Sequence, residues 1–448
     1  MPMPSVINML VRSQEKQPLL PHPSHPSRGY NTLSFNNNQE KGSLTSSIPY
    51  TSHLSPDKRS LLLSLRTKII LSMVAIPAFL LASSAVTSLG PLTPRDIVIR
   101  SPEPAEAHTT SNSNLFASVQ GPLISTQFAD PAIIAHNGIS YAFATNNKGV
   151  GADRINVQVA TSTDNKTWTL MDHHDALPHV GAWETGAGVW APDVVQVDDG
   201  SFVLYYADVP TWAPQHHCVG AATSKNITGP YVPLSQPFAC PNVTTKGGAI
   251  DPDGFHDIAT NKRYVVYKVD GNSLGHGGAC MNSVAPIVPT PLMLQQVAAD
   301  GVTLIGKPTQ ILDRDDIDGP LIEAPSLHRS PQGIYFLFYS SNCFTTPKYD
   351  VSYATANNVL GPYTRSNRPL LITSDAGLVG PGGMDIIKGG GMIVFHGHMT
   401  IQNDPAEYKQ AQNISASTGT PVTSVNLPLI RGMWSATATF SGTSVSLA

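Results

Sequence analysis

A sequence pattern that recurs about every 60 residues constrains the fold of this chain more than any other feature. A copy starts with a short acidic or polar segment that usually holds a proline, continues through a turn, and ends in aliphatic and aromatic residues. In the fourth copy these parts are residues 322–329 and residues 334–339. The five copies begin at Asp130, Trp190, Asp251, Glu323 and Gly380, and the last is degenerate. Apolar runs bounded by turns predict buried β-strands.

A second repeated segment shows that the unit contains more than one hairpin. A strand that ends in small residues follows at 159–162, 220–224 and 351–355. Units of this length and strand content are typical of propeller blades, and five blades close a ring that protects its strand edges. The predicted fold class is therefore all-β, with a five-bladed β-propeller over residues 115–448. We expect the tail near Phe440 and Val445 to complete a blade begun by the N-terminal strand at 115–118.

The chain before the repeats has a different composition. Residues 1–68 are rich in Ser, Pro, Asn and Gln and predict disorder, as a cytoplasmic or mis-extended leader. Residues 69–90 carry no charge, are long enough to span a bilayer as a hydrophobic helix, and follow positive charges. A signal-anchor and a cleaved signal both fit this segment. Residues 91–114 resemble a stalk in composition, and we expect everything before the propeller to be dispensable for activity.

The cysteines and glycosylation sequons all follow the hydrophobic segment. Two disulfides are predicted, because an even number of cysteines is typical of proteins in oxidising compartments. Cys218 and Cys240 flank one hairpin-like unit and are the preferred pair, which leaves Cys280 with Cys343. The sequons lie at Asn165, Asn226, Asn242 and Asn413. We therefore expect an extracellular or cell-surface protein that enters the secretory pathway and contacts the membrane through residues 69–90 if they are uncleaved.

Charge and motifs exclude several function classes. The formal net charge is -4, only 13% of residues are charged, and the repeats hold no basic run, so no nucleic-acid partner is expected. The sequence has no dinucleotide fingerprint and no serine nucleophile elbow. We expect a monomer whose chemistry requires no cofactor.

Acidic residues recur near the starts of the repeats, at Asp130, Asp193, Asp251 and Glu323. The first strand of each propeller blade lines the central axis, so these positions should converge on one mouth of the ring. Carboxylates gathered in one depression repel one another unless they share a proton or a cation. Capping of a turn beside proline explains any one of them, but explains three together poorly. Glycoside hydrolysis needs paired carboxylates, one as acid and one as base or nucleophile.

Four segments resemble, in order, the signature elements of glycoside hydrolase family 43, at residues 128–131, 190–194, 250–252 and 323–327. That family contains arabinanases, α-L-arabinofuranosidases, β-xylosidases and exo-galactanases. The resemblance implies a five-bladed propeller and hydrolysis with inversion. It implies that Asp130 is the general base, Glu323 the general acid, and Asp251 the residue that orients the acid and tunes it. Substrate contacts are expected from Phe128, Trp190 and Asn342, while Asp193 is expected to be structural.

The resemblance also suggests an ion on the propeller axis. The last blade in this family often has a Gly-Pro-Gly-His turn and a strand that ends in histidine. Here Gly383 stands in place of the first histidine, and His396 keeps the second position. Such a histidine helps to hold calcium or another ion in arabinanase-like members, which makes His396 the predicted ligand of a structural calcium. The alternative is a hydrogen-bonded structural histidine.

The predicted function is that of an inverting glycoside hydrolase. Its substrates would be plant cell-wall polysaccharides such as arabinan or arabinoxylan, or their oligosaccharides, with arabinofuranose or xylose at the cleaved site. Glu323 would have to carry a proton at the working pH, which burial and the neighbouring Asp251 would favour. Two alternatives stay open: a carbohydrate-binding propeller without catalysis, and a retaining fructan-active enzyme of the related clan. The second would need an Asn before the Asp-Pro pair, where this chain has Ala129.

Overall fold

The computed structural model describes residues 116–147, 154–399 and 430–447. The predictions for the leader, the hydrophobic helix, the stalk and the sequon at Asn413 lie outside the described residues. Among the described residues, no helix has the length and apolar character needed to cross a membrane.

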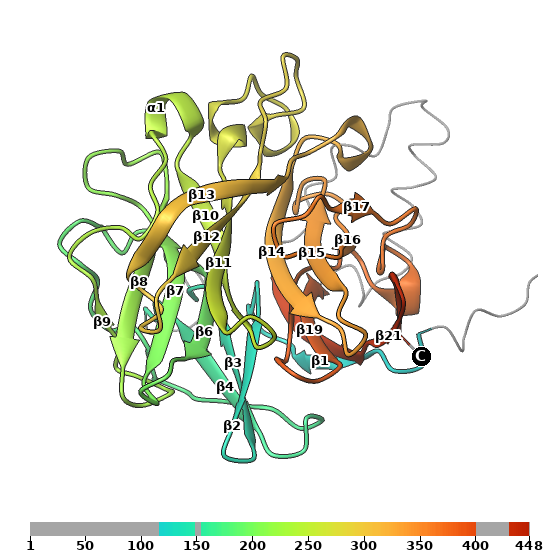
Figure 1. Ribbon diagram of the computed structural model, residues 1–448, viewed down its shortest axis with the longest axis horizontal. Coiled ribbons are helices and arrows are strands. Elements are labelled where there is room, and N and C mark those ends of the chain that lie inside the picture. The colour runs from blue at the N-terminus through green and yellow to red at the C-terminus, as the bar shows by residue number, and fades with distance from the viewer. Residues whose placement is uncertain (1–115, 148–153, 400–429, 448) are drawn as a thin grey trace, which may run out of the picture. The chain divides into compact units, whose positions relative to one another are not determined.

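Five antiparallel sheets of four strands each are arranged as the blades of a propeller (Figure 1). The first blade contains β2 (Ala132–His136), β3 (Ile139–Ala144), β4 (Gln158–Ser162) and β5 (Thr169–Leu170). The second contains β6 (Trp190–Gln196), β7 (Phe202–Asp208), β8 (Cys218–Ser224) and β9 (Val232–Pro233). The third contains β10 (Ala249–Asp257), β11 (Lys262–Val269), β12 (Leu292–Val297) and β13 (Leu304–Leu312). The fourth contains β14 (Ile322–Arg329), β15 (Tyr335–Ser341), β16 (Ser352–Ala356) and β17 (Thr364–Arg365).

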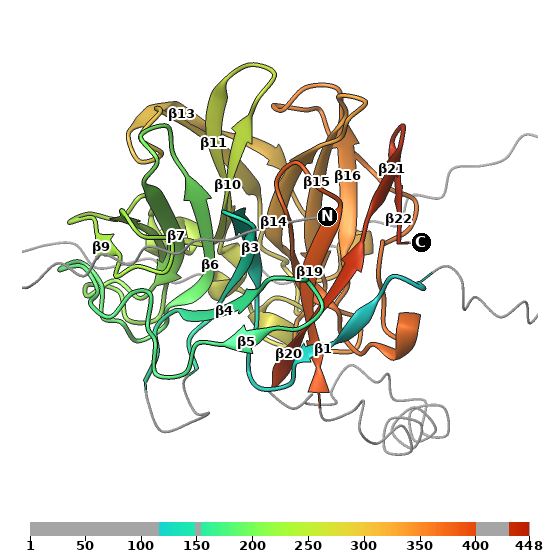
Figure 2. The same ribbon diagram turned by 90° about the horizontal axis from the view of Figure 1, so that it is seen from below.

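The fifth blade joins segments from both ends of the described chain. Its strand order is β1 (Gln120–Ile124), β20 (Arg431–Thr437), β19 (Met392–His398) and β18 (Gly382–Ile386). Figure 2 shows β1 beside β20, and Gln120 is opposite Ser435 in the register. The N-terminal strand therefore closes the ring, a few residues later than predicted. The tail does not complete this blade, since it folds into its own hairpin of β21 (Thr439–Ser441) and β22 (Ser444–Ser446).

Short helices occupy the loops. They are α1 (Val243–Lys246) and the 3-10 turns η2 (Gly271–Leu274), η3 (Ala279–Met281), η4 (Asp316–Asp318) and η5 (Asp375–Gly377). The described fold is thus mostly β, as the repeats predict.

The apolar runs form strands that are buried on both faces. In β15, Phe336 and Phe338 pack into the cluster shared with the fifth blade, whereas Leu337 and Tyr339 pack into the cluster shared with the third. Successive side chains of a strand point to opposite faces, so a strand between two neighbouring blades needs apolar residues at every position. This requirement explains why the runs show no polar alternation.

The same left-handed backbone turn begins the inner strand of every blade. It lies at Asp130, Ala191, Asp251, Ala324 and Gly383, with φ of 53°, 43°, 55°, 48° and 56°. A proline follows in the first four blades, and the strand register shifts at this point in β6, β10, β14 and β18. These five positions are the structural equivalents, which corrects the alignment predicted from sequence. Glu323 precedes its turn residue by one, and Asp193 follows its turn residue by two.

Side chains near the axis tie each blade to the next. Backbone N–H groups of Gly254, Leu327 and Ile133 donate to Asp193 (2.7 Å), Asp253 (2.9 Å) and Asp385 (2.8 Å), respectively. Ser326 donates to Asp385 at 2.9 Å, and Ala191 N–H donates to Thr145 at 2.9 Å. All five junctions therefore carry a bond of this type. Asp193 thus joins the second blade to the third, as expected of a structural residue.

A lysine neutralises the carboxylates that these bonds bring together. Oxygens of Asp193, Asp253 and Asp385 lie within 4.8 Å of one another. Lys388, from the hairpin between β18 and β19, places Nζ 3.0 Å from Asp253 and 3.6 Å from Asp385. Burial raises the pKa of Asp253 to about 6, with a further contribution from the Asp385 charge, although the Lys388 charge opposes this rise. Without the lysine charge, three buried carboxylates would face one another at the centre of the ring.

The two predicted disulfides are present. Cys218 is bonded to Cys240, and Cys280 is bonded to Cys343. The first joins the start of β8 to the segment after β9. The second joins the loop between β11 and β12 to the loop between β15 and β16.

Replacing Lys388 by methionine should destabilise the propeller by about 2–3 kcal/mol. Removing one partner of a buried ion pair costs about 3–5 kcal/mol, and we expect less because the Lys388 side chain is 35% exposed. Urea unfolding at neutral pH would measure the change. Lys225→Met is the control, because Lys225 and Asp199 form a solvent-exposed pair whose loss should cost less than about 1 kcal/mol. Equal stability of the two variants would contradict the balancing function of Lys388.

Candidate active site

Asp130 lies at the mouth of the ring, in a setting that keeps its carboxylate charged. Arg431 of β20 donates to Asp130 Oδ1 at 3.2 Å, and Thr145 donates to Oδ2 at 2.8 Å. The ring of His396 is 3.2 Å from Oδ1 through Nδ1. Burial opposes ionisation, but Arg431 and His396 outweigh it and hold the pKa of Asp130 well below its usual range. Asp130 is therefore an anion at any working pH, as a general base requires.

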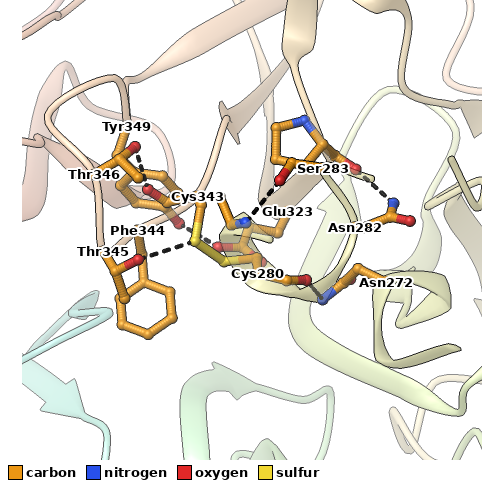
Figure 3. The surroundings of a disulfide bond; sticks show 12 residues. Asn272, Cys280, Asn282, Ser283, Glu323, Cys343, Phe344, Thr345, Thr346 and Tyr349 are labelled. Carbon is orange, nitrogen blue, oxygen red and sulfur yellow. Dashed lines mark hydrogen bonds between the residues drawn. A yellow bond between two sulfur atoms is a disulfide. The ribbon is translucent and has the colours of Figure 1, made fainter. Parts of the chain in front are cut away.

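Glu323 is the second residue of β14, and two hydrogen-bond donors hold its carboxyl group. Lys268 Nζ is 2.9 Å from Oε2. The Tyr349 hydroxyl donates to Oε1 at 2.9 Å, and Figure 3 shows Tyr349 and Glu323. Lys268 also pairs with Asp270 at 3.1 Å. Burial raises the pKa of Tyr349 well above its ordinary value, and so does the Glu323 charge, so the phenol remains a donor. These contacts fix the direction of the Glu323 carboxyl group.

Asp251 lies beside the Glu323 segment, and its own carboxyl group binds the proton that was expected on Glu323. Its Oδ2 accepts from Ala324 N–H, the residue directly after Glu323, at 2.9 Å. Burial, followed by the Glu323 charge, raises the pKa of Asp251 to about 8. Sequence reasoning expected burial and Asp251 to keep the proton on Glu323 itself. In the structure it is the pKa of Asp251 that is raised, so Asp251 binds the proton, while Lys268 donates to the Glu323 carboxyl group.

Trp190 lies where a sugar contact was predicted. It precedes Ala191, which lines the axial cavity, and its side chain is 38% exposed. The indole stacks on the imidazole of His217 with ring centroids 3.7 Å apart. Burial lowers the pKa of His217 to about 4, so a neutral ring supports the indole. The exposed part of this aromatic surface is suited to packing against a sugar.

Of the two other predicted substrate contacts, Phe128 is buried in the core and Asn342 lies in the loop after β15. Phe128 is wrong as a substrate contact, because its side chain is 0% exposed and packs with Ile133 and Met433 in the core. Its place before Asp130 in sequence gives it a core position beneath the mouth. Asn342 is half-buried, its N–H donates to Asp318 O at 2.9 Å, and its amide donates to Ser341 at 3.0 Å. These contacts hold the loop after β15, and substrate binding by Asn342 remains a prediction.

His396 supports Asp130, and its surroundings do not suit a calcium ion. Its side chain is fully buried, its Nδ1 also lies 3.1 Å from Asp130 N, and its Nε2 lies 3.4 Å from the Arg431 guanidinium. Burial, and then the Arg431 charge, lower the pKa of His396 to about 4. A cation at Nε2 would be repelled by Arg431. Both ring nitrogens thus face Asp130 and Arg431, which favours the alternative of a hydrogen-bonded structural histidine, and calcium binding by His396 stays an untested prediction.

Sequence reasoning missed three residues of this site: Lys268, Tyr349 and Arg431. Lys268 carried a usable signal, because a lysine near the end of an apolar run is rarely buried unless it is paired. Tyr349 lies in an irregular loop and Arg431 lies far from the other site residues in sequence. Neither has a local pattern that reveals a contact with Glu323 or Asp130.

A substrate has to bind above the axis and among the loops. The axial cavity, which Asp130 and Asp251 line together with the axial carboxylates, has a volume of about 40 Å³, which suits water and is too small for a sugar ring. The first strand of each blade starts at this mouth and the second strand runs back toward it. The loop between the second and third strands of each blade therefore lies at the mouth. In the described part of the chain these include the loops at 209–217, 270–291 and 342–351. The loops therefore form the walls of the site.

Sequence comparisons match the region that contains this site. A model described as glycosyl hydrolases family 43 matches residues 119–414. An extracellular endo-α-(1→5)-L-arabinanase from Thermotoga petrophila is 26% identical over 253 residues, which cover 52% of this chain and 50% of the arabinanase. The extracellular endo-α-(1→5)-L-arabinanase 2 of Bacillus subtilis is 25% identical over 248 residues, with coverage of 52% and 49%. The chain spans about half the length of these curated relatives.

Solved structures share the propeller fold. A thermostable family-43 glycoside hydrolase superposes with a TM-score of 0.56 at 21% identity, covering 72% of this chain and 93% of that one. An endo-1,4-β-xylanase from Bacteroides thetaiotaomicron superposes with a TM-score of 0.52 at 23% identity, covering 74% and 97%.

Gly383→Ala should lower the rate of glycoside hydrolysis by on the order of 10²-fold, the effect of a displacement of about 1 Å. A Cβ at Gly383 would lie 2.6 Å from His396 Nδ1 and 2.8 Å from Asp130 Oδ1, so His396 and Asp130 must move. Gly389→Ala is the matched control, since Gly389 also has positive φ but has nothing within 4 Å of the added carbon. Equal rates for the two variants, at equal folded fraction, would contradict the assigned contact.

Proposed function

The chain belongs to glycosyl hydrolase family 43, and from this premise we propose that it is an extracellular inverting glycoside hydrolase. Its substrates are arabinan, arabinoxylan or related plant cell-wall polysaccharides, with arabinofuranose or xylose at the cleaved site. Arabinofuranosyl bonds are the first choice, because the two curated relatives are named as endo-α-(1→5)-L-arabinanases. The similarity between this chain and each relative is confined to about half of each protein, so the substrate has to be determined by experiment.

One arrangement supports this function above all others: the mouth holds carboxyl groups in opposite electrostatic surroundings. Arg431 and His396 outweigh burial and hold the pKa of Asp130 low, whereas burial, followed by the Glu323 charge, raises the pKa of Asp251 to about 8. Two carboxyl groups whose surroundings drive their pKa values apart are what acid–base catalysis requires. A protein that only binds carbohydrate has no need of this separation.

The proposed reaction is a single displacement. Asp130 removes a proton from a water molecule while the water oxygen attacks the anomeric carbon. The bond from that carbon to the glycosidic oxygen breaks, and Glu323 delivers the proton that the leaving oxygen needs. This arrangement requires the two carboxyl groups to stand about 6.5–9.5 Å apart, with water between base and sugar.

Neighbouring residues prepare Glu323 for this step. Asp251 holds a proton beside Glu323, and transfer of this proton to Glu323 makes Glu323 the donor. Lys268 and Tyr349 then stabilise the carboxylate that remains after the proton has left. Trp190 supports the sugar at the mouth, and the narrow axis below keeps the reacting carbon at the level of the carboxyl groups.

The names of the curated relatives and the two disulfides both favour an extracellular location. The two curated relatives are named as extracellular, and two disulfides are typical of proteins in oxidising compartments. We propose that the chain follows the secretory pathway, with anchoring through residues 69–90 if that segment is retained.

The purified full chain should hydrolyse linear arabinan and aryl α-L-arabinofuranosides faster than aryl xylosides or aryl galactosides. Glu323→Ala should lose about 10² to 10⁴ in rate on arabinan. It should lose much less on aryl glycosides whose leaving group needs no proton. Asp130→Ala should be impaired on every substrate, because water has to be activated whatever group leaves.

Asp199→Asn is the control, since it changes an exposed carboxylate on the β6–β7 hairpin at the opposite end of the blade. It should retain the parent rate. Binding of arabinan without hydrolysis of any substrate would favour the carbohydrate-binding alternative. Equal losses of Glu323→Ala on good and poor leaving groups would remove Glu323 from the acid position.

A further inference from the structure

We infer that the Cys280–Cys343 disulfide positions both catalytic carboxyl groups, beyond any contribution to stability. The inference rests on the proposed function, because it assigns a purpose to the geometry around Asp130 and Glu323. The bond joins the loop at 270–291 to the loop at 342–351, with Cα atoms 5.5 Å apart. Figure 3 shows the disulfide with Glu323 and Tyr349 among its surroundings.

A short rigid path leads from Cys343 to the acid. Thr346 donates to Cys343 O through its N–H at 2.9 Å and its hydroxyl at 2.8 Å. Tyr349 N–H then donates to Thr346 O at 3.2 Å. Two consecutive turns therefore place the Tyr349 hydroxyl on Glu323 Oε1. Movement of Cys343 would therefore displace Tyr349 and disturb its hydrogen bond to Glu323.

A second path leads to the acid from Cys280. Asn282 is fully buried two residues later, and its amide donates to Val288 O at 2.9 Å and Pro320 O at 2.7 Å. Pro320 precedes Glu323 by three residues. The same loop begins at Asp270, which pairs with Lys268, the cation on Glu323. Cys280 and Cys343 are thus each connected to Glu323 through a separate set of contacts.

The Cys343 side also reaches the base. The Phe344 ring lies under the Arg431 guanidinium at 4.8 Å, and Arg431 donates to Asp130. Tyr349 stacks on His396, with ring centroids 5.7 Å apart and planes within 11°. The residues from 343 to 349 are therefore in contact with the immediate supports of both carboxyl groups. One loop sets the position of acid and base together.

The disulfide holds segments that have little regular structure of their own. The loop at 270–291 contains only η2 and η3, and Cys280 itself has a left-handed φ of 46°. The loop at 342–351 contains no helix or strand. The other disulfide joins segments at β8 and β9 of the second blade, and Asp130 and Glu323 belong to other blades. It therefore offers a matched comparison.

The test compares two double variants of the full chain, Cys280→Ser with Cys343→Ser and Cys218→Ser with Cys240→Ser. Both lose one disulfide, and rates are compared at a temperature where circular dichroism shows each to be folded. We expect kcat of the first to fall at least about tenfold, while the second keeps kcat within about twofold. Loss of the Tyr349 donor disfavours charged Glu323, so the alkaline limb of the first variant's kcat profile should move to higher pH.

Thr346→Val provides a second variant that keeps the disulfide. It removes the hydroxyl bond to Cys343 O with little change of shape, and we expect a smaller loss of kcat with the same direction of pH shift. This variant decides the question if the first double variant does not fold. An unchanged kcat and pH profile in Thr346→Val, or in the folded Cys280→Ser/Cys343→Ser protein, would overturn the inference. An inactive parent protein would instead overturn the proposed function.

Discussion

The structure depends on the convergence of buried carboxylates at the propeller axis and on the lysine that makes this convergence possible. Asp193, Asp253 and Asp385 each accept a backbone N–H from the next blade. These bonds fix the blades relative to one another but bring like charges within 4.8 Å. Lys388 supplies the opposite charge from the far end of the ring. The left-handed turns above this ring then present side chains to the mouth.

Function follows from how each carboxyl group at the mouth is surrounded. Asp130 is beside a guanidinium and is kept charged, while Asp251 is buried beside another carboxyl group and takes up a proton. Glu323 lies between Asp251 and Lys268, so it can both deliver a proton and be stabilised after losing it. The propeller brings these groups from three blades, and the loops above them determine how firmly they are held.

Much of the fold could be predicted from the sequence because the repeat is local. A proline after the turn and an apolar run after the hairpin recur in each of the first four blades. The proline marks the first strand of the blade, and the apolar run marks the second. The offset of Glu323 was not predicted, because only the left-handed backbone conformation identifies Ala324, and not Glu323, as the equivalent of Asp130 and Asp251. Phe128 was misplaced because its nearness to Asp130 in sequence does not reveal that its side chain packs in the core. The support of Asp130 by His396 depends on Arg431, which only the closed ring brings near.

The most direct test of the account is the anomeric configuration of the first sugar released. Proton NMR during hydrolysis of an α-L-arabinofuranoside by the full chain would detect this product before mutarotation. If Asp130 activates water while Glu323 protonates the leaving oxygen, the first product has the inverted β configuration. A first product with the retained α configuration would contradict the account, because it would require one carboxylate to attack the sugar as a nucleophile.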